Sequence, residues 1–413
     1  MNEKLRRDAD IIINNTLKDI QLDDVLRKAL KKHEFPDSLI LIAIGKAAWQ
    51  MAKTASDTLG DKLKKGIVIT KYKHSKGPID NCICFEAGHP IVDENSIQAT
   101  NAVTKCVESL NSNDYVLFLV SGGGSALFES PLVSLHELQS INEQLLRSGA
   151  SIAEINAIRK RLSSVKGGKF AALCAPAHVH TVIVSDVLGN KLDVVASGPS
   201  CSDSSTTEDA LRIINKYNLK ISEEALLHIK KETPKQLTNV THEIISSVHD
   251  LCTCCASNCE KLGYETVIIS EDIDGEAKEV GGLLGEIVKK YASTNKKLAF
   301  VAGGESVVHV NGNGLGGRNQ ELVIGAISHI AGIPNACVFS IGSDGTDGPT
   351  DAAGGYVDGD TLVELSKHNL TLQQILSNND SYHALERVNS LIKTGPTGTN
   401  INDVAVVLID IER

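Results

Sequence analysis

Short apolar, β-branched segments alternate with longer amphipathic segments along this chain, and this alternation constrains its fold more than any other feature. Four segments have the length and composition of buried strands: 39–44, 66–70, 116–120 and 181–185. Helical patterns lie between them, at 47–59, 94–110 and 135–147. Strands that are apolar at successive positions are usually covered on both faces. The sequence therefore predicts an α/β fold, a mostly parallel sheet between helices, with ligands at the carboxyl ends of the strands.

The strand pattern fades between residues 199 and 239 and then resumes, which divides the chain into two parts. A second α/β pattern then follows, with expected strands at 264–270, 298–302 and 337–341. We therefore predict a Rossmann-like domain over residues 1–235 and a second α/β domain over residues 236–413, each with a mostly parallel sheet between helices.

Length and charge exclude several classes of protein. The 413 residues can bury two or three cores without disulfide bridges. Lys and Arg number 41 against 51 Asp and Glu, a net charge of −10, and no basic stripe offsets it, so we expect no nucleic-acid partner. No apolar segment approaches the roughly 20 residues of a membrane span. We expect no membrane partner and a cytoplasmic protein with unpaired cysteines. The sequence leaves homo-oligomerisation open.

Two glycine-rich segments follow expected strands and are candidates for binding anions. The first contains Ser121, Gly122, Gly123, Gly124 and Ser125, and the second begins with Gly303, Gly304 and Glu305. Consecutive glycines can turn several backbone N–H groups toward one phosphate or carboxylate. A tight turn is the alternative, but it accounts for only one or two of the glycines. We therefore favour an anion cradle in each domain.

The familiar nucleotide-binding motifs are absent or incomplete. No segment has the Walker pattern of a P-loop ATPase. Gly312, Gly314 and Gly317 have the spacing of the dinucleotide fingerprint, but no acidic residue follows at the position that would bind a ribose. A Rossmann dehydrogenase is therefore only weakly indicated.

Two cations occupy positions that suggest an anionic ligand. Lys46 follows Gly45 at the expected start of a helix, where the helix dipole disfavours a positive charge. Arg318 lies where glycines give way to another helix, and Asn319 and Gln320 come next. Its planar guanidinium suits carboxylate or phosphate. A surface lysine on its flexible stem is the alternative for Lys46.

Acidic residues complete the candidate site. Asp344 and Asp347 lie in a polar loop after an expected strand, where carboxylates can bind Mg²⁺, although Asp-Gly turns also occur without metal. Asp186 ends another buried strand, at the edge where ligands bind in this fold. A structural role in capping the next turn is the alternative for Asp186.

These motifs together resemble the type II glycerate kinase family, the glycerate 2-kinases whose C-terminal part is called the MOFRL domain. The resemblance rests on ten ordered blocks: Gly45-Lys46-Ala47, Gly88-His89-Pro90 with Asp93-Glu94, Ser121 to Ala126, Arg159 to Ser163 with Lys166 to Gly168, Ser185 to Val187, Ala196 to Pro199, Gly303 to Glu305, Gly316 to Glu321, Asp347 to Thr350 and Thr394 to Asn400. It implies ATP-dependent phosphorylation of D-glycerate at the 2-hydroxyl with a divalent cation, and two α/β domains with the site in the cleft between them. It also implies that Lys46 and Arg318 are the active-site cations. One departure is visible, because Asn190 stands where the family usually has Asp.

One mechanism and two alternatives follow. We expect Lys46 and Arg318 to hold the glycerate carboxylate and the transferring phosphate, without an assignment of which holds which. Asp186 is the candidate general base and Asp344 the candidate ligand for Mg²⁺. The expected substrate and ATP contacts are Ser121, Gly122, Gly123, Gly124, Ser125, Gly303, Gly304, Glu305, Asn319, Gln320 and Asp347. The alternatives are an NAD(P)H-dependent hydroxypyruvate reductase and a small-anion sensor without turnover.

Overall fold

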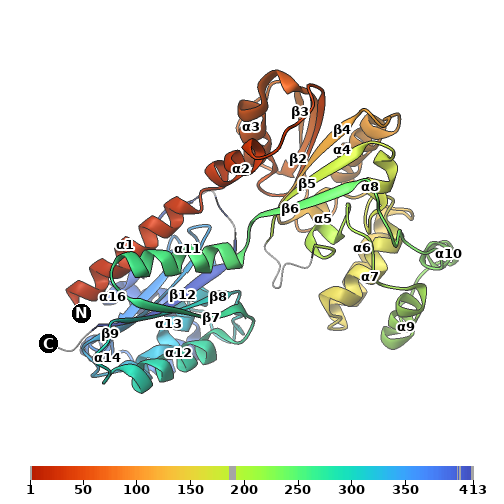
Figure 1. Cartoon of the computed structure of the whole chain (residues 1–413). Coiled ribbons are helices and arrows are strands. Elements are labelled where there is room, and N and C mark those ends of the chain that lie inside the picture. The colour runs from red at the N-terminus through yellow and green to blue at the C-terminus, as the bar shows by residue number, and fades with distance from the viewer. Residues whose placement is uncertain (1, 186–191, 398, 400, 411–413) are drawn as a thin grey trace. The chain divides into compact units, whose positions relative to one another are not determined.

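The chain divides into two compact units, each built on a six-stranded sheet (Figure 1). The computed structural model describes residues 2–185, 192–397, 399 and 401–410. The inner unit comprises Asp23–Ile245, and the discontinuous unit combines Met1–Leu22 with Ser246–Arg413. This division differs from the predicted boundary at 235, since the first 22 residues belong with the C-terminal part of the chain. The reason is that helix α1 (Glu3–Asp19) packs against helix α11 (Val248–Lys261).

The sheet of the inner unit has the strand order β3-β2-β1-β4-β5-β6. The four pairs from β3 to β5 are parallel. This order is that of a Rossmann fold, as the sequence predicts. From β1 the chain continues to β2 on one side, and from β4 it continues to β5 on the other, so the switch point lies between β1 and β4. The elements of this unit are α2 (Leu22–Lys31), β1 (Leu39–Ile44), α3 (Ala48–Leu59), β2 (Leu63–Lys71), β3 (Cys82–Ala87), α4 (Glu94–Val107), β4 (Tyr115–Val120), α5 (Gly124–Leu127), α6 (Leu135–Arg147), α7 (Ile152–Leu162), α8 (Lys169–Cys174), β5 (His178–Val184), α9 (Thr207–Tyr217), α10 (Glu223–Ile229) and β6 (Val240–Ser246).

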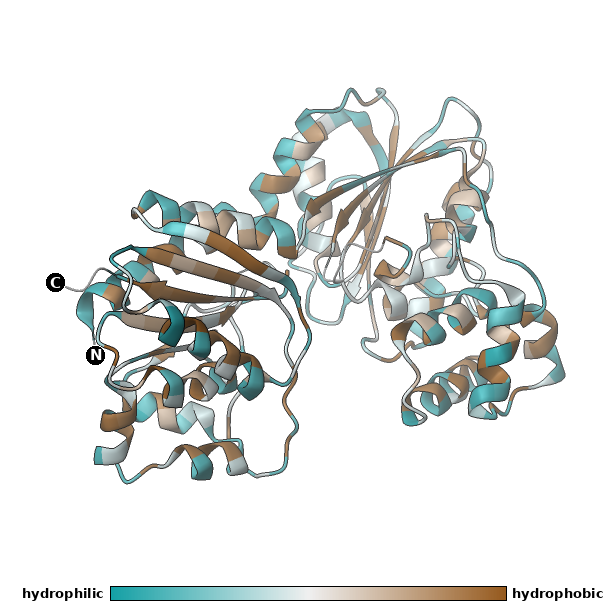
Figure 2. Cartoon of the chain, turned by 60° about the horizontal axis from the view of Figure 1, so that its bottom comes forward, coloured by the Kyte–Doolittle hydropathy of each residue, from teal (hydrophilic) through white to brown (hydrophobic). Residues whose placement is uncertain are grey.

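Both faces of the central strands β1 and β4 are buried, which explains why these two strands are apolar at successive positions. Ile40, Ile42 and Ile44 of β1 belong to a core that includes residues of α4 and α8. The alternate residues Leu39 and Leu41 point to the other face and are equally buried. Figure 2 shows the strands as hydrophobic bands and the helices as half polar. Helices α6, α7, α9 and α10 form a separate core of their own.

The sheet of the discontinuous unit has the order β11-β10-β9-β12-β8-β7. Strands β7, β8, β9 and β11 run in one direction, and β10 and β12 run against them. Helices α12 and α13 cover the face that carries Phe300 and Val338, and α11 packs against the opposite face. The α/β prediction is thereby confirmed for both units, but neighbouring strands in this sheet are antiparallel in four of the five described pairs, and β7–β8 is the parallel pair. The remaining elements are β7 (Glu265–Ile273), α12 (Ala277–Tyr291), β8 (Leu298–Gly304), α13 (Arg318–Ile330), β9 (Ala336–Gly342), β10 (Gly354–Asp358), α14 (Thr361–Lys367), α15 (Leu372–Asn378), α16 (Ser381–Arg387), β11 (Leu391–Ile392) and β12 (Asp403–Ile409).

In the described part of the chain, every helix is too short or too polar to cross a bilayer. All ten cysteines are free thiols, as expected. Cys252, Cys255 and Cys259 are buried on α11, where they act as small apolar residues.

Candidate functional site

The candidate site in the inner unit is built on the two strands that flank the switch point. Gly45 follows β1 with a φ of +114°, and a Cβ at this position would lie 2.3 Å from the Ser121 Oγ. Only glycine fits such a close approach. The next amide, that of Lys46, donates a hydrogen bond to the Gly122 carbonyl at 2.8 Å. The ends of β1 and β4 are therefore tied together, and Lys46 is held at the switch point.

Lys46 is without an anionic partner in the part of the chain that the structure describes. No carboxylate lies within ion-pair distance of its ammonium group among the described residues. Helix α3 begins after Ala47 without a side-chain cap, as the sequence predicts. Burial lowers the pKa of the nearby His89 imidazole, and the charges of Lys46 and Lys71 lower it further. This edge of the sheet is thus electropositive and suited to an anion.

The loop after β4 presents backbone donors to the same place. Ser121 is buried, and its Oγ accepts a hydrogen bond from the Ala47 amide at 3.1 Å. Within the described residues, the amides of 122–125 have no hydrogen-bond acceptor. A Cβ on Gly123 would contact both the His89 ring, at 3.0 Å, and the Lys46 side chain, at 3.1 Å. The loop, the lysine and the histidine therefore lie together, as an anion cradle requires.

A cavity of about 730 Å³ adjoins this loop. Its lining includes Gly123 and Ser125 at the loop, the charged residues Glu129 and Arg159, and apolar residues such as Leu146. A cavity of this size is in the range that holds a cofactor or nucleotide. It is far larger than a three-carbon acid needs.

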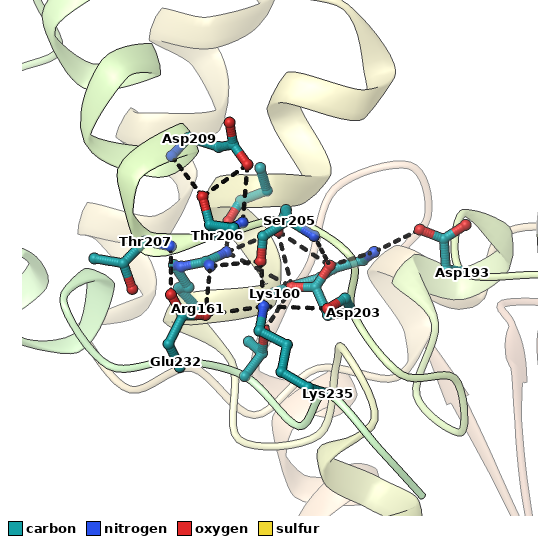
Figure 3. A network of polar contacts seen from close by, with 12 residues as sticks. Lys160, Arg161, Asp193, Asp203, Ser205, Thr206, Thr207, Asp209, Glu232 and Lys235 are labelled. Atoms are coloured by element: carbon teal, nitrogen blue, oxygen red, sulfur yellow. Dashed lines mark hydrogen bonds and ion pairs between the residues drawn. The ribbon is translucent and has the colours of Figure 1, made fainter.

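Arg159 is the first of three successive cations on α7, and Figure 3 shows the polar network that holds the other two, Lys160 and Arg161. Lys160 Nζ lies 3.1 Å from Asp203 Oδ1, and Arg161 donates to the Ser205 Oγ at 2.8 Å. Both side chains are buried in this network and stabilise the fold. Arg159 instead lines the cavity and donates to Asn142 Oδ1 at 2.8 Å. It is therefore the cation of the three that a ligand can reach.

A buried lysine supports the floor of the cavity. Lys166 is fully buried, and its Nζ donates to the carbonyls of Phe128, at 2.7 Å, and Ser125, at 2.9 Å. It also lies 3.4 Å from Glu129 Oε2. Burial lowers the pKa of Lys166, and the Glu129 charge opposes that effect. The sequence motifs contain Lys166 and Arg159 but give no signal of these roles, because the partners are distant in sequence.

Arg318 belongs to the discontinuous unit and, unlike Lys46, is fully paired. Its Nε and Nη2 donate to the two oxygens of Asp403 at 2.5 and 2.9 Å, and its Nη1 donates to Glu305 Oε1 at 2.7 Å. Asp403 starts β12 between the ends of β8 and β9. Burial lowers the pKa of the Arg318 guanidinium, but the hydrogen bonds and the charge of the Asp403 carboxylate raise it. The net result is a raised pKa. Burial raises the pKa of Asp403 to about 6, against the effect of Arg318.

Three expected ligand contacts of this unit have a structural role instead. Asp347 is buried and accepts hydrogen bonds from the amides of Asn319, at 3.1 Å, and Gln320, at 2.9 Å. It therefore caps helix α13 from a distant loop. Asn319 and Gln320 are themselves buried and donate to Asp347. These residues fix the start of α13, and with it the position of Arg318.

The expected anion cradle at Gly303 and Gly304 is also corrected. A Cβ on Gly304 would lie 2.3 Å from the Ile273 amide nitrogen, and one on Gly303 would lie 2.4 Å from Cys252 Sγ. The Glu305 amide donates to the Ile273 carbonyl at 2.7 Å, so it is not free for a ligand. The glycines are there because β7 and α11 pack closely.

Two expected acidic residues remain. Asp344 is half-buried, and its Oδ1 accepts hydrogen bonds from the Thr346 amide at 2.9 Å and hydroxyl at 3.0 Å. It lies near Asp403, since a Cβ on Gly342 would be 3.3 Å from the Oδ1 of Asp344 and 3.4 Å from that of Asp403. Two carboxylates are enough for Mg²⁺ that also binds substrate phosphates. Asp186 and Asn190 lie outside the described residues.

Comparisons with known proteins find matching families, similar relatives and a similar solved structure. Residues 8–230 match a domain of unknown function (DUF4147), and residues 298–403 match the MOFRL family. A D-glycerate 2-kinase of Thermotoga maritima is 49% identical, with 98% of this chain and 99% of that protein covered. A glycerate 2-kinase of Pyrococcus horikoshii is 38% identical, with 95% and 92% covered. A crystal structure of glycerate kinase from Thermotoga maritima superposes with a TM-score of 0.95, at 48% identity and with 98% of this chain and 100% of that chain covered. Two relatives at 35% and 33% identity carry a hydroxypyruvate reductase name.

Proposed function

Because this chain belongs to the type II glycerate kinase family, we propose that it transfers the γ-phosphate of ATP to the 2-hydroxyl of D-glycerate, which yields 2-phosphoglycerate and ADP. One observation carries the proposal for this chain's own residues. Lys46 lies beside the amides of residues 122–125 at the switch point of a Rossmann sheet, and among the residues described neither the ammonium group nor these amides have a partner. That is where phosphates bind in folds of this kind.

The inner unit is proposed to bind ATP. The loop amides and Lys46 would hold the triphosphate, and Arg159 would contact a phosphate or the ribose from the cavity wall. The cavity of about 730 Å³ supports a nucleotide better than glycerate alone. Its apolar residues, such as Leu146 and Ile152, offer a surface for the base.

The discontinuous unit is proposed to act on the same transfer through Arg318. Asp403 holds the guanidinium in a fixed orientation, and Glu305, which is half exposed, is the partner that a ligand can displace. Arg318 would then neutralise charge on glycerate or on the transferring phosphate. Asp344 is the residue proposed to hold Mg²⁺, which when bound would offset the negative charge of the phosphates.

In the transfer, the 2-hydroxyl oxygen forms a bond to the γ-phosphorus while the bond to the β–γ bridging oxygen breaks. The hydroxyl proton leaves to a base, for which Asp186 stays the candidate, and ADP takes the electron pair of the broken bond. A loose transition state makes positioning and charge neutralisation more important than the strength of the base.

The dinucleotide fingerprint, which weakly indicated a reductase, has a structural explanation in this fold. A Cβ on Gly312 would lie 2.3 Å from the Asn378 carbonyl oxygen, and one on Gly314 would lie 2.5 Å from the same atom. These glycines therefore allow a loop to pack against helix α15, which explains their spacing without a dinucleotide. No observation favours a small-anion sensor without turnover over the kinase.

The test is ATP turnover with Mg²⁺ and D-glycerate, with the product identified by phosphorus NMR. We expect 2-phosphoglycerate, and a fall in kcat of about 10²- to 10³-fold in Lys46→Ala, the scale of losing one preorganised charge contact. Lys53→Ala is the matched control, because Lys53 lies in the helix that follows and pairs only with exposed Asp57. Formation of 3-phosphoglycerate would overturn the regiochemistry, and NADH oxidation with hydroxypyruvate without ATP turnover would overturn the kinase.

A further inference from the structure

A second group of ligand-forming side chains lies in the inner unit, away from the proposed kinase site. His33 lies between α2 and β1, His180 on β5 and Glu243 on β6. In the sheet register His180 is opposite Leu117, near the start of β4, whereas the kinase loop follows the carboxyl end of β4. The three residues therefore lie toward the amino ends of the strands, and the phosphate cradle lies at the opposite edge.

The ligand atoms of these side chains converge. His33 Nε2 lies 2.7 Å and His180 Nε2 lies 3.7 Å from Glu243 Oε2, and all three atoms are within 4.8 Å of one another. Donors on a tetrahedral zinc ion, with bonds of about 2.0–2.1 Å, are roughly 3.3 Å apart. A small side-chain adjustment would bring the three to that spacing.

The surroundings of His180 leave its Nε2 atom available to bind a metal ion. The His180 side chain is 4% exposed, and its Nε2 has no hydrogen-bond partner among the described residues. Its Nδ1 lies 2.8 Å from the Thr241 Oγ1. Donation of the Nδ1 proton to this hydroxyl leaves the lone pair on Nε2, as in metal sites whose second ring nitrogen is fixed by a hydrogen bond. An unpartnered buried nitrogen is costly in the absence of a ligand.

A purely structural role explains less. His33 pairs with Glu243, and its ring lies 4.3 Å from that of His180, near Phe35. This packing accounts for His33 and Glu243, which reach solvent. It leaves the buried His180 nitrogen without a partner.

We propose that His33, His180 and Glu243 bind one divalent transition-metal ion of the Zn²⁺ type, with water as the fourth ligand. Two imidazoles and one carboxylate suit zinc and are poor ligands for Mg²⁺, which prefers oxygen alone. The ion joins the segment before β1 to strands β5 and β6. Its role is to stabilise the inner unit, separate from the Mg²⁺ that accompanies ATP.

The test is Zn²⁺ binding to the whole chain after removal of metal with a chelator, measured by competition with a chromophoric chelator. We expect one tight site per chain, weakened at least about tenfold in His33→Ala and in Glu243→Gln. Zn²⁺ should raise the Tm of the wild type but not that of His33→Ala. The activity of His33→Ala with Mg²⁺ and ATP should equal that of the wild type.

His249→Ala is the matched control. His249 also pairs with a glutamate on the surface, at 2.7 Å from Glu271, but no third ligand completes that pair. Co²⁺ provides a second readout, because the proposed site gives visible d–d bands without the charge-transfer band of a thiolate. Absence of binding, equal binding by wild type and His33→Ala, or a thiolate band from the free cysteines would each overturn the proposal.

Discussion

Lys46 and Arg318 are both positively charged, but they differ in whether carboxylates surround them. Lys46 has no anionic partner within the described residues, whereas Arg318 is bound by Asp403 and Glu305. A phosphate can therefore approach Lys46 directly, but at Arg318 it must compete with carboxylates. We therefore propose distinct tasks for the two cations: Lys46 to bind phosphate, and Arg318 to act from a fixed orientation.

The pairing of Arg318 predicts a dependence of activity on pH. Burial raises the pKa of Asp403 from 3.8 to about 6. Below that pH the carboxyl is protonated and no longer fixes Arg318 as an ion pair, so we expect kcat to fall as pH decreases through about 6. Stability responds in the opposite sense. The folded state binds this proton more tightly than the unfolded state. The contribution of Asp403 to the free energy of unfolding therefore decreases as pH rises from 3.8 to about 6.

The measurement is the pH profile of kcat for the wild type and for Asp403→Asn, which cannot titrate at this position. We expect the variant to be about 10- to 100-fold less active near pH 7. The ratio of wild-type to variant activity should decrease toward acid pH. If the ratio stays constant between pH 3.8 and about 6, Asp403 does not cause the decrease in kcat at acid pH.

The cavity predicts a separate effect of Arg159 on ATP binding. Loss of one hydrogen bond from a charged group typically costs about 1.5–3 kcal/mol, so we expect Arg159→Ala to raise the KM for ATP about 10- to 100-fold. Arg147→Ala, at an exposed surface pair with Glu143, is the control and should leave the KM unchanged. An increase confined to the KM for glycerate would assign the cavity to that substrate instead.

The sequence indicates where candidate residues lie when the signal is local. Lys46 and residues 121–125 each follow an expected strand directly, and the parallel pairing of β1 with β4 brings the two strand ends together. Asp403 and Glu129 have no such signal, because their partners Arg318 and Lys166 are far along the chain. Asp347 looks like a ligand from its glycine-rich surroundings, and only the fold shows that it caps α13.

At the scale of elements, helices α12 and α13 pack through glycines. A Cβ on Gly281 would lie 1.8 Å from the Leu322 carbonyl oxygen, whereas one on Gly282 would have its nearest neighbour, the His329 Nε2, at 3.5 Å. We expect Gly281→Ala to force the helices apart and lower the free energy of unfolding by about 1–3 kcal/mol. Gly282→Ala, one position along the same helix, should be neutral or stabilise by up to about 1 kcal/mol. Denaturant unfolding of both variants measures the difference, and equal effects would contradict the close packing.

The sequence predicts interior elements better than edge elements. The bounds of β1 and α6 agree with those expected from periodicity, because these segments have one consistent pattern. The edge strands β3, β6 and β11 are not among the expected strands, and neither is the interior strand β10. β3 lies at the edge of its sheet with partly exposed residues, and β11 has only two residues. Neither buries enough apolar surface to leave a pattern.

At the scale of the whole molecule, the first helix stabilises a part of the chain that is far away in sequence. Asp8 on α1 is buried and accepts a hydrogen bond from the Tyr264 hydroxyl at 2.7 Å, and its carboxylate lies 3.4 Å from Lys297 Nζ. We expect Asp8→Ala to destabilise the discontinuous unit by about 1–3 kcal/mol. Hydrogen exchange should locate the loss in that unit.

Asp10→Ala is the control on the same helix, because Asp10 forms only a half-exposed pair with Arg6. Its effect should stay below about 1 kcal/mol. Faster exchange confined to the inner unit in Asp8→Ala would contradict the assignment of α1.

The assignment of α1 to the discontinuous unit also bears on how the protein is made. The ribosome completes the first 22 residues long before residues 246–413 exist, and the whole inner unit emerges in between. At about 5–20 residues per second, this interval lasts on the order of tens of seconds. During that time the apolar side of α1, with Leu5, Ile12 and Ile13, has none of its native partners. During synthesis the chain thus carries an amphipathic helix whose apolar side must be kept from wrong contacts until residues 246–413 are translated.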